Sequence, residues 1–277
     1  MPSIDENRTV WDREYDWSQG GDEWSQFWGG ADMQWYGGLL PRLHAFLPAP
    51  VILEIAPGFG RWTQYLKDQC SRLILVDVAE KCILACQERF RGCAHIGYHT
   101  NDGSSLACVA DGSIDLAFSF DSLVHVETDV LGGYIAQLSR KLTPDGVGFL
   151  HHSNLGANER RAARGLSLLR RWRSARDVDD HWRATSVSAA SALAQVEAAG
   201  LRCISQELIT VEVGSERCID CISVITTPDS RWERDNVVLR NLEFARERDH
   251  MAVLAAAYGQ GSFRAGMGPQ TSNEPPA

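Results

Sequence analysis

The sequence predicts an α/β fold with a central, mostly parallel seven-stranded sheet and helices on both of its faces. From Pro50 onward, short β-branched runs alternate with segments of helical length, the pattern of a parallel sheet covered by helices. These runs are nearly continuous in apolar residues, as expected of strands buried on both faces. Two further runs separated by a short turn predict an antiparallel hairpin at the end of the sheet.

Each element follows from a local pattern. The expected strands occupy the apolar runs 51–56, 72–77, 94–99, 113–120, 146–151, 201–210 and 217–226. The expected helices cover about 60–70, 79–90, 130–142 and 186–200. The last helix ends at Gly200, because glycine readily adopts the backbone conformation that stops a helix.

Composition shifts divide the chain into four expected segments. A tryptophan-rich N-terminal lid is expected over 1–48, and the main domain over 49–228. Within that domain the arginine-rich stretch 154–183 interrupts the strand and helix alternation and is expected to be an insertion. A helical extension over 229–262 and a flexible tail rich in Gly, Pro and Ser over 263–277 complete the chain.

Charge and composition exclude several classes of protein. The chain has 277 residues, 44% of them hydrophobic, which is enough for a core without disulfides or metals. Its net charge of −9 argues against nucleic-acid and anionic-membrane partners. Neither a long apolar stretch nor a signal-peptide pattern is present, so we expect a cytoplasmic protein with eight reduced cysteines. A homodimer is compatible with the sequence.

The segment LEIAPGFGRWT carries the clearest chemistry. A strand, a Gly-x-Gly turn and a helix leave an open backbone turn for a ligand at the carboxyl end of the first strand. Gly58 and Gly60 form this turn, Glu54 precedes it, and Ala56 stands at the first glycine position. Asp77 ends the second strand, where a carboxylate can accept both hydroxyls of a ribose.

A nicotinamide enzyme would use the same architecture with a third glycine that lets a helix pack behind a pyrophosphate. This chain has Trp62 and Thr63 in that stretch. A bulky indole there argues against pyrophosphate binding.

From Val51 to Thr226 the sequence resembles the class I S-adenosylmethionine-dependent methyltransferases, which have a Rossmann-like fold. The resemblance implies that Glu54 orients the methionine end of the cofactor, Asp77 binds the ribose and Asp102 contacts the adenine. The turn Pro144-Asp145-Gly146 stands where the family usually has Pro-Gly-Gly. The implied cofactor-binding residues are Glu54, Ala56, Gly58, Gly60, Trp62, Thr63, Asp77, Val78, Asp102, Gly103, Ser119 and Phe120.

Histidines near two strand ends are the candidate catalytic groups. His125 follows the fourth strand by five residues, at the edge where a methyl group would be presented. It is the candidate general base, and Asp121 could hold its tautomer. His151 and His152 emerge at the same edge as alternatives. No metal site is expected: Asp121, His125 and His152 could form one, but Mg²⁺ prefers oxygen ligands.

The acceptor is inferred from aromatic and polar residues. Five of the nine tryptophans fall within the first 35 residues, where indoles could cover the cofactor and contact the apolar face of a sugar or simply pack on the core. The candidate acceptor-binding residues are Trp17, Trp28, Trp35, Tyr36, His181 and Arg183.

These features predict an O-methyltransferase that acts on a hydroxyl of a carbohydrate or glycoside, with a small molecule or an oligosaccharide as acceptor. The alternatives are a phenol or amine methyltransferase of secondary metabolism and a non-catalytic binding module. A dispensable His125 would favour an amine, since an amine needs no strong base. A module would not bind S-adenosylmethionine.

Overall fold

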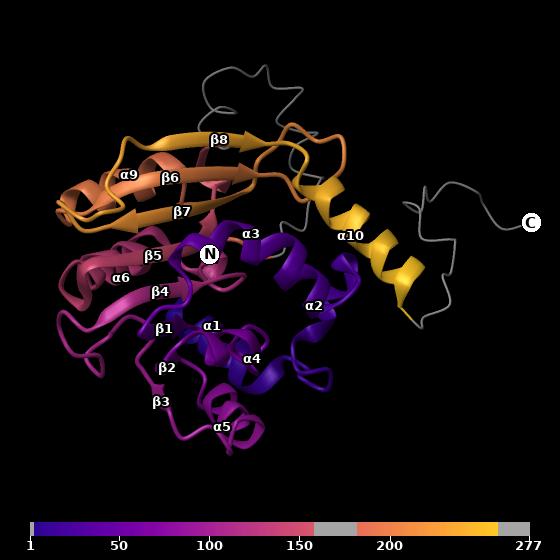
Figure 1. Cartoon of the computed structure of the whole chain (residues 1–277), viewed down its shortest axis with the longest axis horizontal. Helices are drawn as coiled ribbons and strands as arrows, with labels where there is room; N and C mark the ends of the chain where they lie inside the picture. Colours follow the sequence, from indigo (N-terminus) through magenta and orange to yellow (C-terminus); the bar gives the residue numbers. More distant parts are fainter. Residues whose placement is uncertain (1–2, 158–181, 260–277) are drawn as a thin grey trace, which may run out of the picture.

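A single mixed sheet of eight strands organises the chain (Figure 1). The structure, a computed structural model, describes residues 3–157 and 182–259. The strand order is β3-β2-β1-β4-β5-β7-β6-β8. The strands are β1 (Val51–Ile55), β2 (Arg72–Asp77), β3 (Ile96–Thr100), β4 (Ile114–Ser119), β5 (Leu142–Ser153), β6 (Arg202–Ile209), β7 (Asp220–Thr226) and β8 (Val237–Asn241).

The sheet is parallel from β3 to β5, and β7 runs antiparallel to both β5 and β6. The mostly parallel sheet with an antiparallel hairpin at its end is therefore confirmed. The strand number is corrected from seven to eight. Strand β8 pairs parallel with β6 in the extension from 229, where only helices were expected. Its Val237, Val238 and Leu239 are all exposed, so the strand lacks the burial pattern that would mark it in the sequence.

The helices between the strands and after β8 follow the expected order. They are α4 (Thr63–Leu66) with the short η5 (Lys67–Gln69), α5 (Glu80–Arg89), η6 (Leu123–His125), α6 (Thr128–Lys141), α9 (Ala189–Ala198) and α10 (Phe244–Tyr258). Helix α4 begins later than expected because the residues before it form the glycine turn. Ser188 caps the start of helix α9, because its hydroxyl accepts a hydrogen bond from the Ser191 amide.

Seven short helical pieces precede β1 and lie against one side of the domain (Figure 1). They are α1 (Ile4–Thr9), η1 (Val10–Glu14), η2 (Asp22–Trp28), α2 (Ala31–Gln34), η3 (Trp35–Leu39), α3 (Leu40–Leu43) and η4 (His44–Phe46). We call residues 3–28 the N-terminal arm. Trp28 and Trp35 are buried and belong to the core.

Alternation along the strands separates two hydrophobic clusters, one on each face of the sheet. Ile52 and Phe118 pack with the N-terminal helices and α5 on one face. Leu53 and Ala117 pack with α6 and α9 on the other. Both faces are thus buried, which leaves the carboxyl ends of the parallel strands as the place for a ligand. No helix in the ranges 3–157 and 182–259 is long and apolar enough to cross a membrane.

Candidate active site

A pocket of about 920 Å³, including its open mouth, lies over the carboxyl ends of β1, β2 and β4. The pocket is lined from three sides: the glycine turn after β1, the loops after β2, β3 and β4, and the N-terminal arm.

The glycine turn is held in a conformation that most residues avoid. Ala56, Gly58 and Gly60 have φ angles of 57°, 57° and 85°, in the left-handed region. Ala56 has a Cβ, so its conformation is strained by about 1–3 kcal/mol. Strain of this kind concentrates at ligand sites, which agrees with the position of this residue in the pocket wall.

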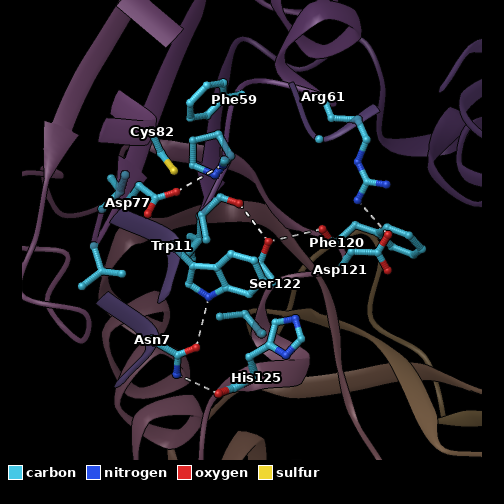
Figure 2. Close-up of a pocket in the computed structure, with 18 of the residues that line it drawn as sticks. Asn7, Trp11, Phe59, Arg61, Asp77, Cys82, Phe120, Asp121, Ser122 and His125 are labelled. Carbon is cyan, nitrogen blue, oxygen red and sulfur yellow. Dashed lines mark hydrogen bonds and ion pairs between the residues drawn. The ribbon is translucent and has the colours of Figure 1, made fainter. Parts of the chain in front are cut away.

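Asp77 connects the turn to the end of β2. Its Oδ2 accepts a hydrogen bond from the Gly58 amide at 3.2 Å (Figure 2). Its Oδ1 accepts one from the Ala79 amide at 2.9 Å. Burial raises the pKa of Asp77 to about 6, against the effect of these amide donors.

Two buried polar atoms beside the turn have no partner among residues 3–157 and 182–259. They are Glu54 Oε1 and Trp62 Nε1. Burial raises the pKa of Glu54 to about 8, although Thr63 donates a hydrogen bond to its other oxygen at 2.6 Å. The methionine end of S-adenosylmethionine carries an ammonium and a carboxylate. Trp62 lines the pocket, so its indole N–H could donate a hydrogen bond to that carboxylate, whereas Glu54 lies outside the lining. The donor and acceptor set therefore fits this cofactor.

The structure separates the predicted cofactor residues into two groups. Those that line the pocket are Ala56, Gly58, Trp62, Asp77, Val78, Gly103 and Phe120. Those that lie outside its lining are Glu54, Gly60, Thr63, Asp102 and Ser119. Asp102 accepts hydrogen bonds from the Ser104 and Ser105 amides, and Ser119 Oγ donates to the Ile55 carbonyl.

His125 lies in the pocket wall opposite the glycine turn (Figure 2). Its Nδ1 is 3.1 Å from the carbonyl oxygen of Trp182, and its ring is 5.3 Å from that of Trp11. Burial lowers the pKa of His125 to about 4, so the ring is neutral at pH 7.

The sequence spacing suggested that Asp121 could hold the His125 tautomer, but in the structure the Asp121 carboxylate contacts other groups. Its Oδ2 pairs with Arg61 Nη2 at 2.8 Å, and its Oδ1 is 3.3 Å from His151 Nδ1. Burial disfavours its charge, but Arg61 and His151 overcome that effect and hold the pKa of Asp121 at about 2. With φ 63°, Asp121 is also in the left-handed region.

His151 and His152 lie behind the pocket rather than in its wall. His151 is buried between Asp121 and Asp220, with Nε2 3.4 Å from Asp220 Oδ2. Burial alone would lower its pKa, but the two carboxylates raise the pKa of His151 to about 9. His152 Nε2 is 2.8 Å from the Ser223 hydroxyl, and burial lowers its pKa to about 4.

The predicted acceptor residues are dispersed. Trp17 lines the pocket, Trp28 and Trp35 are core residues, and Tyr36 is exposed. Arg183 pairs with Asp220 outside the pocket. His181 and most of the arginine-rich stretch lie outside the described residues, as does all of the tail 263–277. Among the residues described, no cluster of His, Cys, Asp and Glu could hold a metal ion.

The N-terminal arm supplies lining residues that the sequence did not single out. Asn7 donates to the His125 carbonyl at 2.9 Å, and it accepts a hydrogen bond from Trp11 Nε1 at 3.2 Å (Figure 2). Trp24 also lines the pocket, and the Arg61 guanidinium lies 5.5 Å from its ring. Arg61 had one signal in the sequence: it is a charge placed directly after Gly60.

The fold and pocket define a class of protein, a Rossmann-like enzyme with its ligand site at the carboxyl ends of the parallel strands. Residues 52–146 match the family model described as a methyltransferase domain. The chain therefore contains a methyltransferase domain over these residues. No curated protein matches it in sequence.

Solved structures share the fold at low sequence identity. A protein of Pyrococcus horikoshii OT3 is 18% identical, with a TM-score of 0.50 over 68% of this chain and 87% of that one. An S-adenosylmethionine-dependent methyltransferase of Methanosarcina mazei is 16% identical, with a TM-score of 0.50 over 68% and 98%. The N-methyltransferase NodS of Bradyrhizobium japonicum WM9 is 17% identical, with a TM-score of 0.50 over 71% and 96%.

Proposed function

We propose that the chain transfers a methyl group to a hydroxyl of a carbohydrate or glycoside, with His125 as general base. The observation that carries the proposal is the state of His125 in the pocket wall. A carbonyl oxygen can only accept a hydrogen bond, so the Nδ1 that faces Trp182 carries the proton. In a neutral ring, Nε2 then holds the lone pair that a base needs.

The chemistry divides between cofactor and protein. S-adenosylmethionine, when bound, supplies an activated methyl group on a sulfonium. The protein aligns the acceptor and takes its proton. The acceptor oxygen would form the new bond to the methyl carbon as the carbon–sulfur bond breaks and leaves its electron pair on sulfur. The acceptor proton would move to His125 Nε2, while Nδ1–H stays hydrogen-bonded to the Trp182 carbonyl.

The rest of the wall supports a sugar-like acceptor. Trp11 lies beside His125 and Trp24 lines the same pocket, and indole faces pack well against the apolar face of a pyranose. Asn7 and Asp121 add polar groups to the same wall. An aromatic phenol could also stack there, so a phenol or amine methyltransferase of secondary metabolism is the second candidate.

An acceptor screen with labelled S-adenosylmethionine tests the proposal. Sugars and glycosides are expected to be methylated in preference to phenols and amines. His125→Ala is expected to lower kcat by roughly 10²–10⁴-fold with little change in cofactor affinity. The matched control is His99→Ala, because His99 lies on β3 outside the pocket.

The pH profile gives a second test. Only the neutral ring accepts a proton, so kcat should fall as the pH is lowered through about 4, the pKa of His125. Full activity of His125→Ala on a sugar would overturn the assignment of His125 as the general base. Methylation of amines alone would overturn the proposal that the acceptor is a carbohydrate or glycoside.

A further inference from the structure

Fixing the His125 tautomer requires a carbonyl oxygen that stays in place. The oxygen belongs to Trp182, which has φ 60° in the left-handed region. A bulky residue avoids this conformation unless its surroundings hold it. The groups that hold Trp182 therefore also decide which nitrogen of His125 carries the proton.

The next residue provides one anchor. Arg183 Nε donates to Asp220 Oδ1 at 2.6 Å, and Nη2 donates to Oδ2 at 2.8 Å. Two parallel hydrogen bonds fix the guanidinium plane as well as its position. Asp220 is buried and is the first residue of β7, so the anchor is part of the rigid sheet.

The backbone provides the other anchor. The Ala184 amide donates to the Val124 carbonyl at 2.9 Å, and Val124 is the residue before His125. The Ala184 carbonyl accepts a hydrogen bond from Ser153 Oγ at 2.6 Å. The segment 182–184 is thus tied to η6 on one side and to β5 and β7 on the other.

We propose that Arg183 and Asp220 are positioning residues that set the tautomer of His125 by holding the Trp182 carbonyl against its Nδ1. Neither residue lines the pocket, so both act through the backbone of Trp182. The catalytic consequence rests on the proposed function of His125, whereas the tautomer itself does not. Arg183 therefore acts behind the base rather than on the acceptor.

Arg183→Lys is the informative variant. Lysine keeps a positive charge opposite Asp220 but cannot make the two-pronged contact. Replacing Asp220 would be less specific, because Asp220 also lies 3.4 Å from His151. The matched control is Arg202→Lys, in an exposed pair with Glu233.

Nitrogen-15 NMR of the histidine rings reads the tautomer directly, with the His125 signals assigned by their loss in His125→Gln. The wild type should show a protonated Nδ1 and an unprotonated Nε2 at pH 7. Arg183→Lys should mix the two tautomers and lower kcat about tenfold, the size of one net hydrogen bond, while acceptor KM changes little. Arg202→Lys should leave both unchanged.

Each outcome bears on a different claim. A wild-type ring protonated on Nε2 overturns the positioning proposal without any variant, so the test survives if Arg183→Lys does not fold. An unchanged tautomer in a folded Arg183→Lys also overturns it. A mixed tautomer with unchanged turnover supports the positioning role and overturns His125 as the base.

Discussion

Replacing Asp77 should weaken binding of S-adenosylmethionine by a predictable amount. Both carboxylate oxygens already accept amide hydrogens, from Gly58 and Ala79. A carboxylate offers about four acceptor positions, so about two remain for the hydroxyls of a ribose. Each hydrogen bond to a charged group contributes roughly 1.5–3 kcal/mol, so the loss of one of them already corresponds to a 10-fold to 150-fold higher Kd for Asp77→Ala.

The pKa of Asp77 adds a more specific signature. Because burial raises this pKa to about 6, the carboxyl becomes protonated as the pH is lowered through that value. A protonated carboxyl accepts weaker hydrogen bonds, so wild-type affinity should fall between pH 7.5 and pH 5. Asp77→Asn keeps the shape of the side chain without its titration, so its affinity should be low and independent of pH in this range.

Isothermal titration calorimetry from pH 5 to 8 measures both effects, with Asp68→Asn as the control because Asp68 is exposed and outside the pocket. Wild-type affinity in Asp77→Ala would refute the role of this carboxylate. A pH dependence that persists in Asp77→Asn would show that another group titrates, and Glu54, whose pKa burial raises to about 8, is the next candidate.

Two further predictions concern the arm and the buried charges. Deleting residues 1–20 removes Asn7, Trp11 and Trp17 but keeps the core residue Trp28. Cooperative thermal unfolding should persist, while turnover of the acceptor should be lost. Unchanged kinetics would show that the N-terminal arm only packs against the core. The folded protein raises the pKa of His151 to about 9 from its ordinary value of 6.5. The stabilisation that protonated His151 provides is therefore complete below pH 6.5 and is lost as the pH rises through 9. The free energy of unfolding in urea should differ between wild type and His151→Asn by about 3 kcal/mol less at pH 9.5 than at pH 6. A difference that does not change with pH would contradict this.

Residues close in sequence to a strand end were accessible to prediction. Asp77 ends a parallel strand, and Gly58 and His125 follow two others. Parallel strands end at one edge of a sheet, so the convergence of these residues on the pocket follows from topology. The sheet itself was predicted from its apolar runs, apart from β8. Whether Asp77 binds ribose or His125 takes a proton stays a prediction.

Contacts between distant segments could not be predicted in this way. Trp11 lines the pocket, whereas Trp28 packs on Phe244. Which indole faces the pocket depends on how the N-terminal arm packs against the rest of the domain, and no periodicity in the sequence encodes this packing. The pairing of Arg183 with Asp220 joins residues 37 apart across a strand end. Asp220 gave one signal, since a carboxylate at the start of an apolar strand needs a partner.

The indoles of the arm have an optical consequence. Trp11 has its ring centroid 6.0 Å from that of Trp17 and 5.5 Å from that of Trp24, and Trp17 stacks on Phe59 with ring centroids 4.5 Å apart. Chromophores this close couple their transitions, so the three indoles of the N-terminal arm contribute to the near-ultraviolet circular dichroism and the intrinsic fluorescence. The protein therefore carries an internal, label-free reporter of whether its arm is closed over the glycine turn.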